Sequence, residues 1–264
     1  MAAPTEQVDY SPEYTGERIV PGVSPPRFLQ EHAARYVFAG SFCRNKKVLD
    51  VASGLGYGTD YLRAVGSVVT GLEIDAESVR HSRMQYPESE FVCGNAEELP
   101  VHWGGAFDVV VSFETIEHLP HPERFLDGVF RCLRPGGLFV CSTPNKDLFF
   151  LQGAQRFHCK EFYSKEFVRL VASRFRVRSI YGQSFRPRWH VVPMFSFALL
   201  RRVMSIAGFK SLGLGAAMTK DGGSSPFEGN TIAEARILSR FVPVEVSAGR
   251  IPTFVVVVAE KSPN

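Results

Sequence analysis

Acidic and imidazole side chains gather in the segment Phe113–Pro120, which reads F-E-T-I-E-H-L-P. If this segment turns as a helix before Pro120, then Glu114, Glu117 and His118 lie at i, i+3 and i+4 on one face. Two carboxylates and an imidazole on one face can bind a divalent metal ion or provide a general base. The structural alternative is that the motif belongs to the fold and that His118 is hydrogen-bonded locally.

A glycine-rich turn follows a short apolar run that contains Asp50. Residues 53–58 read S-G-L-G-Y-G and precede a helical pattern. Glycines at a strand-to-helix turn let the backbone approach a ligand closely and leave the helix N-terminus free for an anionic group. A dinucleotide-binding G-x-G-x-x-G pattern begun at Gly54 would need a third glycine where Thr59 stands, so the spacing argues against that site. An ordinary tight turn is the structural alternative.

An acid stands at the end of the next predicted strand, Val68–Ile74. In nucleotide-binding α/β folds, a carboxylate at this place accepts hydrogen bonds from ribose hydroxyls. We therefore predict that Glu73 is a ribose ligand, and we expect Asp75 to cap the helix that follows.

Five motifs, in this order, resemble those of class I S-adenosylmethionine (SAM)-dependent methyltransferases. They are V-L-D-V-A-S-G-L-G-Y-G, G-L-E-I-D, G-N-A-E-E-L-P, F-D-V-V-V-S-F-E and L-R-P-G-G-L-F-V, and they lie within residues 47–144. The resemblance implies that SAM is the cofactor. It implies that Asp50, Gly54 and Gly56 surround the methionine part and that Glu73 and Ile74 lie at the ribose. Asn95 and Ala96 would contact the adenine, and Phe113 would lie beneath the cofactor. Asn95 departs from the aspartate common at the adenine position, but its amide can still donate or accept a hydrogen bond.

The reaction centre resembles a narrower group. The E-T-I-E-H motif, a later T-P-N and a loop histidine are similar to those of metal-dependent sugar-hydroxyl methyltransferases, including RNA ribose methyltransferases. This resemblance implies that Glu114, Glu117, His118 and His158 bind Mg²⁺ or Mn²⁺, which would polarise the acceptor hydroxyl. Imidazole is an uncommon ligand of magnesium, so zinc is a further alternative. We predict His118 and Glu117 as catalytic residues, with His118 the base if the site holds no metal.

The N-terminal arm carries a resemblance of its own. Residues 14–21 read Y-T-G-E-R-I-V-P and, with Glu31 and His32 further on, resemble the entry segment of bacterial methyltransferases that act on glycans and glycosylated metabolites. Among these, the segment is similar to that of the mycobacterial O-methyltransferases of methylmannose polysaccharide assembly. The resemblance implies that the arm folds over the cofactor and that Tyr14 and Arg18 contact cofactor or substrate. A surface-packing arm is the alternative.

These patterns together predict methylation of a hydroxyl on a sugar or oligosaccharide. A metal-free small-molecule N- or O-methyltransferase and an RNA ribose 2'-O-methyltransferase are the alternatives. Arginines and aromatic residues do alternate within residues 174–189, as an RNA groove would require. The net charge of only +3 and the lack of an appended RNA-binding module nevertheless favour a glycan or small molecule over nucleic acid. A non-catalytic sensor is disfavoured because the residues of the reaction centre are all present.

Alternating strands and helices must position these residues. Strand patterns cover Lys47–Ala52, Val68–Ile74, Phe91–Cys93, Phe107–Phe113, Leu138–Ser142, Phe175–Tyr181 and Thr253–Ala259. Helical patterns cover Arg27–Phe42, Tyr57–Ala64, Glu77–Gln85, Glu123–Leu133 and Lys165–Ser173. This alternation predicts an α/β fold with a Rossmann-like, doubly wound, mostly parallel sheet of seven strands, covered on both faces.

The flanking regions complete the predicted organisation. Residues 1–42 are expected to form a proline-rich arm and a helix over the cofactor site, and residues 43–264 the methyltransferase domain. Residues 186–250 interrupt the pattern before the last strand with candidate helices over 192–207 and 231–241. We expect this insertion to be a lid, a wall of the acceptor site or the contact of a homodimer.

Composition places the chain in a broad class. The first ten residues have neither a basic segment nor an apolar run, and no apolar stretch is long enough to cross a bilayer, so we expect a cytoplasmic protein without a signal peptide or membrane span. The five cysteines lack C-x-x-C spacing and are expected to be reduced thiols.

Overall fold

The computed structural model describes residues 18–149, 156–187, 242–246 and 250–263. Its α-helices are α1 (Pro26–Cys43), α2 (Tyr57–Ala64), α3 (Ala76–Gln85), α4 (Pro122–Cys132), α5 (Lys146–Phe149) and α6 (Ser164–Ala172). Short 3-10 helices are η1 (Ala96–Glu98), η2 (Val101–Trp103) and η3 (Ile116–His118). The strands are β1 (Lys47–Val51), β2 (Val68–Glu73), β3 (Glu90–Cys93), β4 (Phe107–Phe113), β5 (Leu133–Pro144), β6 (Arg176–Pro187), β7 (Val244–Glu245) and β8 (Arg250–Glu260).

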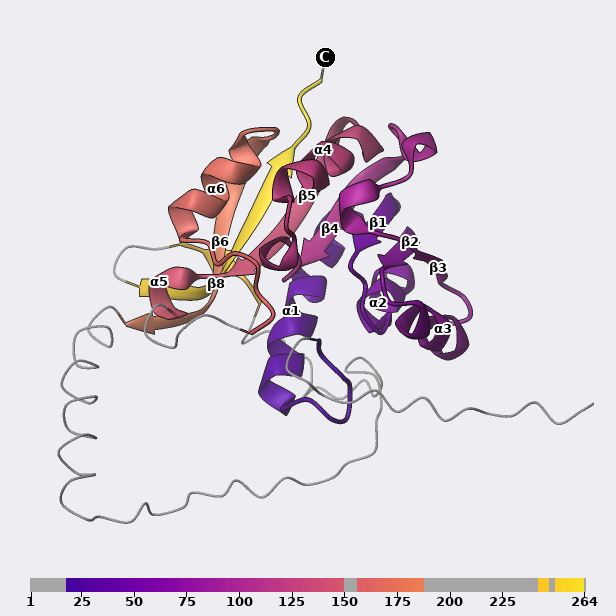
Figure 1. Ribbon diagram of the computed structural model, residues 1–264, viewed down its shortest axis with the longest axis horizontal. Coiled ribbons are helices and arrows are strands. Elements are labelled where there is room, and N and C mark those ends of the chain that lie inside the picture. Colours follow the sequence, from indigo (N-terminus) through magenta and orange to yellow (C-terminus); the bar gives the residue numbers. More distant parts are fainter. Residues whose placement is uncertain (1–17, 150–155, 188–241, 247–249, 264) are drawn as a thin grey trace, which may run out of the picture.

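These strands form one sheet in the order β3-β2-β1-β4-β5-β8-β6-β7 (Figure 1). Strand β1 pairs in parallel with both β2 and β4, so the chain order reverses beside β1. In doubly wound sheets, ligands bind in the crevice that such a reversal leaves at the carboxyl ends of the strands. The predicted α/β class is confirmed. The sheet has eight strands in the described residues rather than the seven expected, because the two-residue strand β7 adds to its β6 edge.

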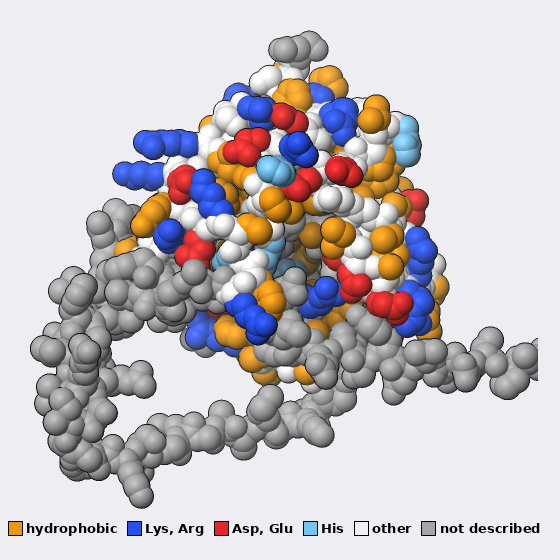
Figure 2. Space-filling view, in the orientation of Figure 1, with side chains coloured by type: hydrophobic (Ala, Val, Ile, Leu, Met, Phe, Trp, Pro, Cys, Tyr) orange, Lys and Arg blue, Asp and Glu red, His pale blue; other side chains and the backbone are white. Residues whose placement is uncertain are grey.

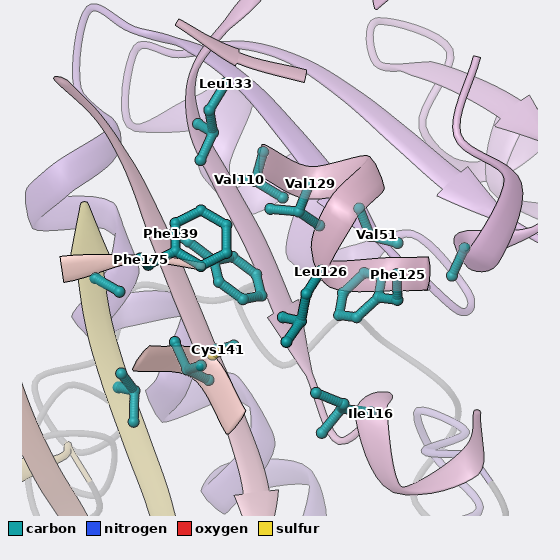
Figure 3. Packing of buried hydrophobic residues seen from close by; sticks show 14 of the residues in the cluster. Val51, Val110, Ile116, Phe125, Leu126, Val129, Leu133, Phe139, Cys141 and Phe175 are labelled. Atoms are coloured by element: carbon teal, nitrogen blue, oxygen red, sulfur yellow. The ribbon is translucent and has the colours of Figure 1, made fainter. Parts of the chain in front are cut away.

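Two apolar layers hold the sheet between helices. Alternate side chains of a strand point to opposite faces, so Leu49 and Val51 belong to one buried cluster and Val48 to the other. Figure 3 shows the first cluster, where Phe125 and other residues of α4 pack against the central strands. The second cluster contains Tyr36 of α1 together with buried residues of α2 and α3. Helices on both faces therefore fix the strand ends where the predicted site residues lie.

Most element bounds agree with the sequence patterns in the described part of the chain, but β5 begins five residues before its predicted strand and β6 ends six residues after its own. Predicted helix Arg27–Phe42 corresponds to α1, and Asp75 caps α3 by accepting a hydrogen bond from the Glu77 backbone at 3.3 Å. All five cysteines are free thiols. None of the described helices is long and apolar enough to span a membrane. The candidate helices over 192–207 and 231–241 lie outside the described residues, while β6 and β8 extend into both ends of the expected insertion.

Candidate active site

A cleft of about 510 Å³ opens at the carboxyl ends of β1, β2 and β4. Its size is typical of a site for a small molecule or cofactor. On the face drawn in Figure 2 the surface is hollowed near its middle, and histidine side chains lie at the hollow. The lining residues come from the arm and α1, from the turns after β1 and β3, and from the ends of β2 and β4: Arg18, Ile19, His32, residues 52–55, Tyr57, residues 72–74, residues 94–97, residues 113–115 and residues 118–120.

Glu73 is held in place at the end of β2 by backbone donors. The amide of Gly54 donates to Glu73 Oε2 at 2.9 Å, and the amide of Asp75 donates to Oε1 at 3.1 Å. A Cβ built on Gly54 would have no atom within 4 Å, so open space lies beside this glycine. The turn after β1 and the acid that ends β2 are thus joined directly, and the carboxylate is held in one orientation at the cleft. This geometry fits the adenosyl part of SAM.

The structure brings most of the predicted cofactor residues to the cleft. Those that line it are Arg18, Gly54, Glu73, Ile74, Asn95, Ala96 and Phe113. Arg18 is tied to Asp75 by an ion pair of 2.7 Å, so the end of the arm is fixed at the end of β2. Tyr14 lies outside the described residues.

Asp50 and Gly56, which were expected to surround the methionine part, do not line the cleft. Asp50 is buried beneath it, where its carboxylate accepts hydrogen bonds from Thr59 at 2.7 Å and from the Tyr36 hydroxyl at 3.2 Å. Burial raises the pKa of Asp50 to about 7, against the hydrogen bonds from Thr59 and Tyr36. Gly56 has a φ of 82° and faces α3, where a Cβ would come within 2.7 Å of Ser82. Both residues shape the turn from the side opposite the cleft.

Three of the four predicted metal ligands converge. The ligand atoms of Glu117, His118 and His158 all lie within 4.8 Å of one another, and the two imidazole rings meet edge to face with centroids 4.9 Å apart. His118 Nδ1 lies 2.9 Å from the Phe157 carbonyl oxygen, a contact that requires the proton on Nδ1 and leaves the Nε2 lone pair available. A carboxylate and two imidazoles form a donor set suited to Mn²⁺, Fe²⁺ or Zn²⁺ as well as Mg²⁺.

Glu117 is positioned from several sides. Its backbone carbonyl accepts hydrogen bonds from the amides of Cys159 and Lys160, and the Thr143 hydroxyl donates to Oε2 at 3.0 Å. Oε1 is buried without a hydrogen-bond partner, as is Nδ1 of His158. Burial raises the pKa of Glu117 to about 7. Burial, followed by the neighbouring His118, lowers the pKa of His158. His158 Nδ1 also lies 3.7 Å from Glu161 Oε1, whereas the unpartnered Glu117 Oε1 beside the two imidazoles fits a cation held between the three side chains.

Glu114, the fourth predicted ligand, lies outside this group. The expected helical turn is only η3, and Glu114 precedes it with a left-handed φ of 53°, so the i, i+3, i+4 face is not formed. Its carboxylate instead makes an ion pair with Arg35 of α1, whose guanidinium is almost fully buried. Burial lowers the pKa of Arg35 to about 10 and leaves the side chain charged at neutral pH. Glu114 still lines the cleft, but its partner is a buried cation.

A helix over the cofactor site was expected at the end of residues 1–42, but His32 and Arg35 of α1 were not predicted as site residues. His32 lines the cleft with Tyr57, and Arg35 bonds Gln183 of β6 at 2.5 Å as well as Glu114. The polar residues Glu31, His32 and Arg35 stand at helical spacing in an otherwise apolar part of α1, a pattern that indicates a buried polar face. That spacing was the available signal for these residues.

Comparisons with known proteins agree with this geometry. Residues 49–141 match a family model described as a methyltransferase domain. The chain is 35% identical over 176 residues to a probable SAM-dependent methyltransferase of Mycolicibacterium smegmatis, which covers 65% of this chain and 68% of the relative. It is 34% identical over 162 residues to another from Mycobacterium tuberculosis, covering 60% of this chain and 58% of that one. A ubiquinone biosynthesis O-methyltransferase of Psychrobacter cryohalolentis is 33% identical over 120 residues, with 42% and 47% covered.

Solved structures share the fold at low sequence identity. A SAM-dependent methyltransferase of Thermotoga maritima superposes with a TM-score of 0.55 at 16% identity, covering 90% of this chain and 94% of that one. A TehB-like SAM-dependent methyltransferase of Corynebacterium glutamicum gives a TM-score of 0.52 at 15% identity, with 90% and 100% covered. The fold, the acid and glycine turn of the cleft and the sequence relatives agree, and the chain belongs to the class I SAM-dependent methyltransferases.

Proposed function

We propose that this methyltransferase transfers the methyl group of SAM to a hydroxyl of a sugar or oligosaccharide, and that a divalent ion bound by Glu117, His118 and His158 assists the transfer. One observation carries the proposal. His118 both lines the cofactor cleft and belongs to the group of three ligand residues. An acceptor that enters the cleft beside His118 therefore meets a site able to activate a hydroxyl.

The reaction requires a proton acceptor. A lone pair of the acceptor oxygen attacks the methyl carbon, the carbon–sulfur bond breaks with its electron pair remaining on sulfur, and the hydroxyl proton leaves to a base. A divalent ion in this site would polarise the hydroxyl and lower its pKa. His118 Nε2 holds the lone pair that would bind the ion or, in a metal-free site, take the proton, because Nδ1 is engaged by Phe157. Thr143 keeps the Glu117 carboxylate oriented in either case.

Two further observations bear on the acceptor. The relatives named as ubiquinone biosynthesis O-methyltransferases support transfer to oxygen. Three arginines of the segment that would suit RNA are already in ion pairs, Arg174 with Asp127 and both Arg176 and Arg178 with Glu260. Carboxylates beside these arginines weaken any attraction to phosphates, so a neutral glycan is favoured over RNA.

The test combines metal binding with acceptor screening. Mn²⁺ binding, followed by electron paramagnetic resonance, should be lost in Glu117→Gln and His158→Ala and kept in His102→Ala, which alters an exposed histidine of η2. Radiolabelled SAM should then be offered with mannose oligosaccharides, phenols and amines, and RNA, each with and without EDTA. Sugar methylation that EDTA abolishes and Mn²⁺ restores is the expected result.

Other outcomes would overturn parts of this proposal. Methylation of a phenol or amine that EDTA does not affect would establish the metal-free small-molecule alternative. Methylation of RNA in preference to sugars would establish the ribose alternative. Mn²⁺ binding that survives in Glu117→Gln and His158→Ala would remove the metal from these residues.

A further inference from the structure

The imidazole of His32 is placed in the cleft by the helix that precedes the methyltransferase sheet. His32 lies on α1 and lines the cleft. Its ring packs against Tyr36 and Tyr57, with centroids 5.5 Å and 5.7 Å away. Its Nδ1 forms a short hydrogen bond with the Tyr57 hydroxyl. Two tyrosine rings and one hydrogen bond thus fix the orientation of this imidazole.

The contact with Tyr57 permits the tautomer of His32 that carries its proton on Nε2. Burial, together with the nearby Arg35 charge, lowers the pKa of His32, so the ring is neutral at physiological pH. Burial raises the pKa of Tyr57, so its hydroxyl keeps the proton that it can donate to Nδ1. A neutral imidazole that accepts at Nδ1 carries its own proton on Nε2. Nε2 has no hydrogen-bond partner among the residues that the structure describes, so in this tautomer its N–H can donate to a ligand.

The position of His32 identifies which end of the cofactor it would meet. Glu73, the predicted ribose ligand, ends β2, and Asn95 and Ala96 line the cleft after the neighbouring strand β3. His32 is bonded to Tyr57, the first residue of α2, where the helix N-terminus favours an anionic group. The Ser53 hydroxyl, in the same turn, is buried and unpartnered. A carboxylate of the ligand is therefore expected at this end.

We propose that His32 binds the carboxylate of the methionine part of SAM by donating a hydrogen bond from Nε2, and that the Tyr57 hydroxyl supports this tautomer by donating to Nδ1. The inference rests on the use of SAM by the protein and is independent of which acceptor is methylated. Carboxylates of Glu73, Glu97 and Glu114 also line the cleft. A neutral donor can bind the cofactor carboxylate without adding another charge to this buried site.

The test compares two ligands that differ only in the carboxylate, SAM and decarboxylated SAM, by isothermal titration calorimetry. His32→Phe keeps a ring in place and removes the donor, so we expect it to weaken SAM binding about 10- to 100-fold, the effect of losing one hydrogen bond to a charged group. Binding of decarboxylated SAM should change little. His32→Gln, which retains an N–H donor, should recover part of the affinity, and Tyr57→Phe should cause a smaller loss for SAM alone.

Two control variants show what a loss of binding to both ligands and a loss to neither look like. Glu73→Gln should weaken both ligands, because both contain the ribose, and His102→Phe should weaken neither. Equal weakening of both ligands by His32→Phe would show a packing role and overturn the proposal, and so would unchanged SAM binding. If His32→Phe does not fold, His32→Gln and Tyr57→Phe carry the same comparison between ligands. Failure of the unaltered protein to bind SAM is a different outcome, because it would overturn the cofactor assignment itself.

Discussion

The ring of Tyr36 in α1 lies directly against Gly58 in α2, so closely that a Cβ on Gly58 would come within 2.1 Å of it. The hydroxyl of the same tyrosine bonds Asp50 at the end of β1. Gly58 stands one position earlier than the third glycine of a dinucleotide-binding turn, and the structure gives it a different purpose. It makes room for the helix that carries His32 to the cleft and Arg35 to its ion pair with Glu114.

Gly58→Ala should therefore destabilise the fold, because the cost of overpacking against Tyr36 exceeds the gain in helix propensity. Overpacking a buried contact costs about 1–3 kcal/mol, whereas replacing a helical glycine by alanine contributes only about 1 kcal/mol in favour. Urea unfolding should show a lowered free energy of unfolding for Gly58→Ala. Gly128→Ala in α4 is the matched control, because its Cβ would meet only the flexible Leu99 side chain at 3.3 Å. Equal stability of the two variants would contradict the close Tyr36 contact, and Tyr36→Ala should reduce the effect of Gly58→Ala.

Asp50 should make the free energy of unfolding fall as pH rises, whereas a carboxylate in a surface ion pair makes it rise. Its pKa is raised from 3.8 to about 7 in the fold, so the folded protein binds this proton more tightly than the unfolded chain. The stabilisation is complete below pH 3.8 and is lost as pH rises through 7, a change on the order of 4 kcal/mol. Asp50→Asn does not titrate, so the unaltered protein should lose stability relative to this variant between pH 4.5 and pH 7.5. Asp50→Asn also alters hydrogen bonds, but that effect on the free energy of unfolding does not change with pH and so does not affect the comparison. A difference that stays flat would mean that Asp50 is ionised in the fold throughout this range.

Glu114→Gln should separate the two roles predicted for this carboxylate. Since Glu114 pairs with Arg35 and lies outside the group of Glu117, His118 and His158, its loss should leave Mn²⁺ affinity unchanged. The variant should be less stable by about 1–3 kcal/mol, because the buried guanidinium loses its carboxylate partner while Gln183 remains. Calorimetric Mn²⁺ titration and thermal unfolding test the two expectations. A fall in Mn²⁺ affinity as large as that of Glu117→Gln would restore Glu114 as a fourth ligand.

Local sequence patterns were sufficient for the fold class and for the part of the cleft lined by Gly54 and Glu73. Alternation of apolar strands with helices predicted the doubly wound sheet, and a parallel arrangement brings the ends of β1 and β2 to the same edge. The proximity of Gly54 and Glu73 follows from that arrangement and needs no further information. His118 and His158 were also paired in advance, through a resemblance of motifs rather than through spacing, because 40 residues separate them.

The sequence by itself determined which backbone turn and which acid lie at the cleft, because periodicity and glycine placement act over a few residues. Only the tertiary structure decided the role of the charged groups around them. Arg35 of α1 donates a hydrogen bond to Gln183 of β6, which lies 148 residues further along the chain. The same buried guanidinium pairs with Glu114, so this carboxylate is not available to the two histidines. The packing of the helices against the sheet likewise places Asp50 beneath the cleft and His32 at its wall. Desolvation and long-range ion pairing depend on which surfaces meet, and no local pattern encodes them.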